Sequence, residues 1–598
     1  MIVALNIIKT MLFVFSCLGY ILFINRKLKV RGEMAPLLFI AGCVVISLIS
    51  GILNMLIYTN ILILLVGIFL FYISTKDLLK NDGIKNILKI LTNPNTICIT
   101  ILFIYFILIA SRLHIVHYDN FTHWALVVQD MLELNQLPNF ESLITYKSYP
   151  LGTALFIYYF CFWVGSLENV MIIAQSVILV ASVSCLFVFV PKTKFSWLYR
   201  LLIITFLVLS SIFYMSFKEL LVDTILATVG LGALATIIYY YKDLKKTIII
   251  SSLLSTFLIM IKNSGIYFLV INIIIVLYRI YTAFKNNELD KHNALKYLAF
   301  SLILPLSIMV MWKAHLPYAF GKNVYLGAHN MSIIKYGGQL LRTDFETIGK
   351  ITKAFLLEII NIRSKILQSI LLINAVYLIY IFLIYFTQKK WNKQIIFSWI
   401  VTDVIYIAYL IGTYVMYIFS MPVEEALYLA GFDRYLSTII IYLIGILVIC
   451  IMKTKQDAKI LNMLNKIIAC TLIILFSSNI LTSDTKSNII GKDNYENSVK
   501  CTMDKIKMQN TFDTEDTEKK YAVCIIDDSN LDIGYIKYMS KYIFRTNNVV
   551  VIKNLTDSSK EYIKTADYVV ILSGNTALEE VLKESSINQK VIDAKLLK

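Results

Sequence analysis

Charged residues are scarce in this chain, and so are the residues that interrupt helices. Only 16% of the 598 residues are Asp, Glu, Lys or Arg, and just 22 are glycine and 8 are proline. Hydrophobic residues make up 58%, and the mean hydropathy is +0.71. This composition excludes a soluble globular protein. Because many apolar runs reach the ~20 residues that cross the hydrocarbon core, we expect a polytopic α-helical membrane protein.

Paired cysteines are lacking as well. The nine cysteines are scattered, seven of them inside apolar runs, and none belongs to a Cys-x-x-Cys pair. The spacing indicates neither a disulfide framework nor a structural zinc site. The first apolar run, 2–24, has no small-residue cleavage site after it. We therefore interpret it as a retained membrane helix and not as a signal peptide.

The formal net charge of +17 does not indicate a nucleic-acid partner, because most Lys and Arg residues before the tail lie in short loops between apolar runs. Such loops fix the orientation of a protein in the bilayer and face the cytoplasm. The basic segments 26–31 and 76–89 are therefore expected inside. The polar segment 112–148 follows one helix later. After Arg112 it contains a single Lys or Arg residue, Lys147, so we expect this segment outside.

The apolar run 149–165 decides the topology. It is short for a span, and if it crossed the membrane, the later basic loops would all move outside. If it only dips into the outer leaflet, those loops all lie inside, so we predict a re-entrant or interfacial helix. About 14 spans then remain, with both termini outside: 2–24, 35–58, 61–74, 97–111, 169–190, 201–217, 221–240, 247–262, 264–279, 297–314, 365–387, 395–419, 435–452 and 467–482.

The predicted domains follow from this pattern. Residues 1–96 form N-terminal membrane helices, and 97–482 form the main membrane domain with outer loops 112–148 and 315–364. Residues 483–520 are polar and are predicted to be a linker with some helix.

Residues 521–598 are predicted to be a small extracytoplasmic α/β domain, to which we assign no chemistry. Its β-rich runs alternate with helical stretches, as in a small parallel sheet. The expected strands are 522–528, 549–554 and 568–574, and the expected helices lie near 532–543, 559–566 and 576–585.

The segment 117–124, His-Tyr-Asp-Asn-Phe-Thr-His-Trp, is the strongest candidate for a site. Asp119 lies just beyond the end of a hydrophobic helix, among histidines and a tryptophan, where a membrane enzyme could hold a base. The simpler interpretation is an ordinary aspartate in an outer loop.

Other ionisable residues lie near expected outer helix ends. Lys218 and Asp223 are at or near membrane depth, where such residues usually face a cavity or a partner. Arg434 opens a late span and offers a planar fork suited to phosphate. The simpler interpretations are an interfacial ion pair for Lys218 and Asp223, and a helix-end anchor for Arg434.

Two further charged segments have simpler interpretations still. Lys262 can extend its amine to the membrane interface, and Glu424 and Glu425 are expected on a short surface helix.

A carboxylate and several cations on the outer face would nevertheless suit transfer from a lipid-linked phosphate donor. Cations can neutralise the departing phosphate, and a carboxylate can deprotonate the attacking group.

Two short motifs carry a family resemblance: 118–124, Tyr-Asp-Asn-Phe-Thr-His-Trp, and 149–152, Tyr-Pro-Leu-Gly. They resemble the outer-loop motif Tyr-Asp-x-Phe-Ser/Thr-His-Trp and the Tyr-Pro-Pro-Gly element of bacterial multi-pass members of the GT-C superfamily of polyprenyl-phosphate-sugar glycosyltransferases. The resemblance covers roughly residues 97–440. Asp223 matches an aspartate near the outer end of a downstream helix of that family, and Arg434-Tyr435 matches an Arg-Tyr pair that opens a late span.

The resemblance implies a GT-C-like fold in the cell membrane and an extracytoplasmic active site. It implies transfer of a sugar from a polyprenyl-phosphate donor to a glycan or lipid acceptor of the cell envelope, with inversion at the sugar carbon. Asp119 would be the catalytic base. The residues expected to bind substrate or phosphate are His123, Lys218, Asp223, Arg434 and Tyr435.

This chain departs from the family pattern at two positions. Asn120 stands where many members have an acidic residue, which puts paired-carboxylate chemistry in doubt, and Leu151 replaces the second proline. The loop lacks an Asp-x-Asp motif, so no metal or other cofactor is predicted. A divalent-cation site formed by His117, Asp119 and His123 is the arrangement left open.

Two other functions remain open at this stage. A transporter or flippase of lipid-linked saccharide should show an internal repeat and interrupted helices near the midplane, and we find no such repeat. A surface-polysaccharide polymerase or ligase would share the outer site but use an oligosaccharide donor. In any of these, 315–364 could act as a lid or acceptor platform.

Overall fold

The computed structural model describes residues 2–82, 88–212, 217–326, 338, 344–454, 459–480, 495–509, 518–528, 530–584 and 590–594. Parts of the expected outer loop 315–364 and of the expected linker 483–520 lie outside these ranges.

Twelve helices in the described ranges are long and apolar enough to cross a membrane, which confirms the polytopic helical class. The two other predicted spans coincide with 17-residue helices, α5 (Pro94–Ala110) and α9 (Ser196–Ile212). The long helices are α1 (Ile2–Arg26), α2 (Ala35–Ile52), α3 (Leu56–Asp77), α8 (Glu168–Ser184, which η3, Cys185–Phe189, extends to 22 residues), α10 (Asp223–Tyr240), α11 (Leu244–Ile261), α12 (Gly265–Lys285), α13 (Lys291–Phe320), α16 (Lys365–Gln388), α17 (Lys393–Phe419), α19 (Phe432–Lys453) and α20 (Lys459–Ile480).

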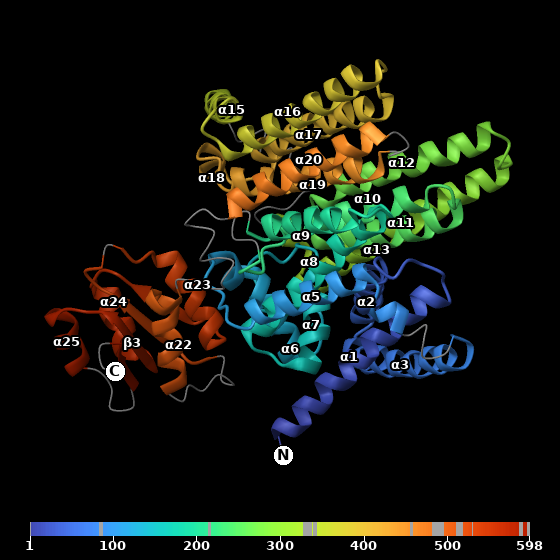
Figure 1. Cartoon of the computed structure of the whole chain (residues 1–598). Helices are drawn as coiled ribbons and strands as arrows, with labels where there is room; N and C mark the ends of the chain where they lie inside the picture. Colours follow the sequence, from blue (N-terminus) through green and yellow to red (C-terminus); the bar gives the residue numbers. More distant parts are fainter. Residues whose placement is uncertain are drawn as a thin grey trace.

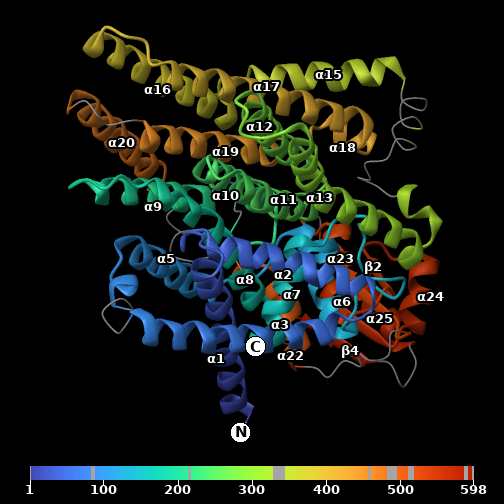
Figure 2. The same ribbon diagram turned by 90° about the vertical axis from the view of Figure 1, so that its right-hand side faces the viewer.

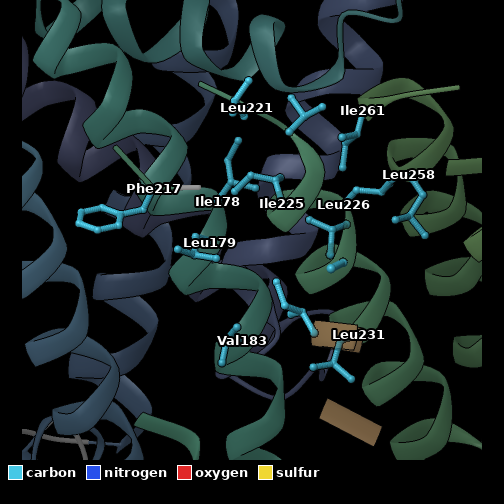
Figure 3. Packing of buried hydrophobic residues seen from close by; sticks show 14 of the residues in the cluster. Ile178, Leu179, Val183, Phe217, Leu221, Ile225, Leu226, Leu231, Leu258 and Ile261 are labelled. Carbon is cyan, nitrogen blue, oxygen red and sulfur yellow. The ribbon is translucent and has the colours of Figure 1, made fainter. Parts of the chain in front are cut away.

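The centre of the bundle is α10, which packs against α8, α11, α12 and α19 (Figures 1 and 2). Small residues allow this close approach, since a Cβ at Gly230 would lie 2.8 Å from Phe268 and one at Gly445 would overlap Leu231. Hydrophobic side chains fill the remaining space. Figure 3 shows the cluster contributed by α8, α10, α11 and the segment before α10: Ile178, Leu179, Val183, Phe217, Leu221, Ile225, Leu226, Leu231, Leu258 and Ile261.

The run predicted to be re-entrant forms α7 (Gly152–Val164). Its 13 residues extend about 20 Å at 1.5 Å per residue, well short of the ~30 Å hydrocarbon core. Residues 152–161 are buried in protein, as a non-spanning helix at membrane depth requires. Its first residue sits against the end of α11, because a Cβ at Gly152 would lie 2.5 Å from the Met260 carbonyl oxygen.

The tail folds as the predicted small parallel sheet, with strand order β2-β1-β3-β4. Its elements are β1 (Tyr521–Ile525), α23 (Ile533–Phe544), β2 (Val549–Ile552), α24 (Asp557–Thr565), β3 (Tyr568–Ser573), α25 (Thr576–Lys583) and β4 (Lys590–Asp593). The strand β4 was not predicted, because its four residues hold only two apolar side chains. Within the expected linker lie the short turn η6 (Tyr495–Asn497) and α22 (Val499–Gln509).

The tail lies against the polar segment 112–148 (Figures 1 and 2). The Tyr535 hydroxyl donates to the Val116 carbonyl oxygen at 2.9 Å, and Arg545 pairs with Asp130 at 2.6 Å. The linker helix α22, which packs against α23 of the tail, reaches the start of α8, where Lys500 pairs with Glu168 at 2.9 Å. The segment 112–148, the start of α8 and the tail therefore share one face of the protein.

Candidate functional site

The motif around Asp119 forms the first turns of a helix. Asp119 directly precedes a π-helical turn, η2 (Asn120–Trp124), whose five residues are all buried, and α6 (Ala125–Leu134) follows. The turn is held from outside by the Thr145 backbone N–H, which donates to the Thr122 carbonyl oxygen at 3.0 Å. Such π-turns recur at functional sites. Here the turn leaves the Asp119 side chain 25% exposed at the edge of a buried segment.

Asp119 is joined to distant helices by a chain of opposite charges. Arg434 Nη1, in the first turn of α19, lies 2.5 Å from Asp119 Oδ2, and Arg434 Nε lies 3.7 Å from Asp223 Oδ2. Asp223 opens α10, and its Oδ1 accepts from Lys262 Nζ at 2.7 Å. Carboxylates and cations thus alternate across four separate segments. The Lys262 amine and the Arg434 guanidinium also lie 4.7 and 5.2 Å from the Tyr435 ring centroid.

These charges line a cavity of about 220 Å³. Carboxylates, cations and aromatic rings all contribute to its wall. The lining residues are Tyr118, Asp119, His123, Trp124, Tyr146, Tyr149, Asp223, Lys262, Met421, Glu425, Ala430, Gly431, Arg434 and Tyr435. The cavity can therefore offer a substrate both charge and flat apolar surface.

Aromatic rings form one wall of the cavity. Tyr146 and Tyr149 stack at 5.0 Å, and the rings of Trp124 and His123 lie against Tyr149 at 5.7 and 5.0 Å. His123 is only 1% exposed, and burial lowers its pKa to about 3, so its ring is neutral. Within the described residues, neither ring nitrogen has a hydrogen-bond partner.

The histidine before Asp119 supports the turn. The Asp119 backbone N–H donates to His117 Nδ1 at 3.1 Å, so this nitrogen is occupied. Burial lowers the pKa of His117, although the Asp119 carboxylate opposes the shift. No three His, Cys, Asp or Glu side chains in the described part of the chain form a metal-binding group, including the His117, Asp119 and His123 set left open above.

Five of the six predicted site residues line the cavity: Asp119, His123, Asp223, Arg434 and Tyr435. The sixth, Lys218, is buried but is not among the lining residues. Asp223 pairs with Lys262.

Two charged lining residues were not predicted as site residues. Lys262 had been interpreted as an interfacial lysine and Glu425 as part of a surface helix; Glu425 does lie on a short helix, α18 (Val423–Leu427). The sequence feature that could have identified Lys262 as a site residue was its position. It stands in a turn of a few residues between two spans, at the same membrane level as the start of α10.

Comparison with known proteins gives a likeness at the level of structure only. The sequence matches no family model and no curated protein. Two solved structures are similar: ArnT from Cupriavidus metallidurans bound to undecaprenyl phosphate, with a TM-score of 0.35, and the same protein in the apo state, with 0.36. Each is 10% identical, and each alignment covers 83% of this chain and 89% of the other. The function proposed below rests on the cavity itself.

Proposed function

We propose that this protein is a membrane glycosyltransferase of the GT-C type. It transfers a sugar from a polyprenyl-phosphate donor to a glycan or lipid acceptor of the cell envelope, on the outer face of the membrane. The observation that carries the proposal is the alternation of Asp119, Arg434, Asp223 and Lys262 around one cavity. This arrangement supplies a base and a phosphate-binding pair within reach of each other.

The two cations suit the phosphate of the donor. Arg434 offers a planar fork that can bind phosphate oxygens in pairs, and Lys262 adds a compact charge on the other side of Asp223. As the bond between the sugar carbon and the phosphate oxygen breaks, negative charge grows on the leaving phosphate. Fixed cations at that point stabilise the transition state more than the ground state.

Asp119 suits the acceptor. Its carboxylate accepts the proton of the attacking hydroxyl while the hydroxyl oxygen bonds to the sugar carbon, and polyprenyl phosphate leaves from the opposite side. The products are the glycosylated acceptor, with inverted configuration, and polyprenyl phosphate. In the free protein Asp119 is paired with Arg434. An arriving phosphate competes for Arg434 and releases the carboxylate to act as the base.

The aromatic wall suits the sugar. Tyr146, Tyr149 and Trp124 offer flat faces to the C–H side of a sugar ring. The cavity of about 220 Å³ has room for a monosaccharide but not for a long oligosaccharide, which favours transfer of a single sugar over polymer ligation.

The test is Asp119→Asn in protein reconstituted into lipid nanodiscs with a panel of polyprenyl-phosphate sugars. The active donor is identified first by comparing the envelope glycans of the wild-type and deletion strains. We expect transfer to fall by at least ~10²-fold, the lower end of the loss when general-base catalysis is removed, while folding and insertion remain normal. The matched control is Glu141→Gln, an exposed carboxylate of the same loop. Unchanged transfer by Asp119→Asn would reject the assignment, and movement of the intact saccharide across the bilayer without bond cleavage would indicate a flippase.

A further inference from the structure

A buried carboxylate and a buried amide join the Asp119 turn to the segment that leads into α10. Asn120 is fully buried and Glu219 is 3% exposed. Asn120 Nδ2 donates to Glu219 Oε2 in a short hydrogen bond. The Val116 backbone N–H also donates to Glu219, at 3.1 and 3.2 Å from its two carboxylate oxygens. In return, the Leu220 backbone N–H donates to Asn120 Oδ1 at 3.3 Å.

The contact joins residues that are close in the chain to the two carboxylates that Arg434 bridges. Asn120 directly follows Asp119, and Glu219 comes one helical turn's length of chain before Asp223. The segment is fixed from a third side, because Gln175 Nε2 of α8 donates to the carbonyl oxygens of Glu219 and Leu221 at 3.0 Å each. A change in the contact would therefore move Asp119 relative to Asp223.

The hydrogen bonds also fix which group each position requires. Asn120 Oδ1 is occupied by the Leu220 N–H, so its amide nitrogen must face Glu219. A carboxylate at position 120 would face a second buried carboxylate, an arrangement that is costly away from water. The departure of Asn120 from the acidic residue of the GT-C motif thus matches the presence of Glu219 across from it.

We propose that Asn120 and Glu219 are positioning residues that set the separation of Asp119 and Asp223, and with it the span that Arg434 bridges. The role in transfer rests on the proposed function. The geometric role does not, since it concerns the order of the Asp119 turn in the protein as it stands.

The chain allows a reciprocal exchange as the test. Asn120→Asp alone places two carboxylates together, and Glu219→Gln alone leaves too few acceptors for the Val116 and Asn120 donors. The double variant reverses the polarity of one hydrogen bond and keeps the others: the side-chain amide at position 219 would donate to the carboxylate at position 120 and accept from the Val116 N–H. We therefore expect both single variants to be impaired and the double variant to recover.

Two measurements follow the exchange on purified protein in nanodiscs. Hydrogen exchange of the peptide containing Val116 reports the turn directly; its rate should rise about ten- to a hundredfold in each single variant, the effect of losing a hydrogen bond to a charged group, and return near the wild-type rate in the double. The kcat for sugar transfer should fall and recover in parallel, with KM for the donor changing less.

The matched control is Asp403→Asn, which alters another amide–carboxylate contact, Asn374 to Asp403 at 3.0 Å between α16 and α17. It should leave exchange at Val116 unchanged. Recovery of folded, protected protein in the double variant supports the proposal even if the single variants do not accumulate. Wild-type exchange at Val116 in either single variant, or a double variant as impaired as the singles, would overturn it. If exchange follows the expected pattern but wild-type protein transfers no sugar, the proposed function fails and the positioning role stands.

Discussion

Arg434 and Asp119 are 315 residues apart in the sequence, yet their side chains meet at 2.5 Å at the edge of the cavity. The same guanidinium lies 3.7 Å from Asp223 through its Nε. One planar side chain thus spans two carboxylates from separate segments. The function of the cavity therefore depends on which groups compete for the Arg434 guanidinium.

The first prediction concerns the shape of the Arg434 side chain. Arg434→Lys keeps the positive charge, but a single ammonium group cannot contact Asp119 and Asp223 through separate nitrogens of one planar group. We expect transfer to fall on the order of 10²- to 10³-fold, the size of effect seen when one transition-state donor is removed. Steady-state kinetics against donor concentration measure this loss. Retention of most activity in Arg434→Lys would mean that charge alone suffices and that the fork has no role.

The second prediction concerns the docking of the tail. Arg545 is 9% exposed, and its Nη2 donates both to Asp130, which is 2% exposed, and to Glu133. Its Nε also donates to Glu133, and its Nη1 donates to Gln129. Arg545→Met would leave the Asp130 carboxylate buried without its charged partner, and breaking such a buried pair typically costs about 3–5 kcal/mol. We expect a clearly lower unfolding temperature and cleavage of the tail by added protease.

The control for this prediction is an exposed pair in the same domain. Lys564 and Glu584 lie 2.5 Å apart but are open to solvent, so Lys564→Met should leave the unfolding temperature unchanged. Equal behaviour of the two variants would show that the Arg545 contact does not hold the tail in place.

The third prediction is a pH dependence with a defined sign. Burial lowers the pKa of His123 from 6.5 to about 3. Between these values the unfolded chain binds a proton that the folded protein does not, so stability rises with pH and is lost as the pH falls from 6.5 towards 3. We expect His123→Phe to reduce this loss of stability at acidic pH, measured as the unfolding temperature of nanodisc samples at a series of pH values. A loss as steep as that of the wild type would exclude His123 as its source.

The sequence was sufficient to predict the spans, the short helix 149–165 and the sheet of the tail, because hydrophobic periodicity and length decide these locally. It also indicated five residues that meet at the cavity. It could not distinguish Lys218 from Lys262 as the partner of Asp223, since both stand near an outer helix end and only packing decides which one faces inward. The tail contact was equally hidden: Arg545 closes α23 in a left-handed conformation (φ 58°), and no local pattern connects it to Asp130.

The last prediction tests the topology on which the outer site depends. The tail contacts Val116, and α22, which packs against the tail, contacts Glu168, so the segments before and after α7 lie on one face. Between the 112–148 segment and the tail lie ten of the predicted spans, an even number, which agrees only if α7 does not cross. A cysteine at Ser196, one span further on, should therefore be protected from a membrane-impermeant maleimide in intact cells, whereas a cysteine at Glu141 should react. The labelling of both cysteines is measured in a variant that lacks the exposed Cys470. Labelling at Ser196 from outside would require α7 to span, and the tail could not then reach the Asp119 turn from the same side.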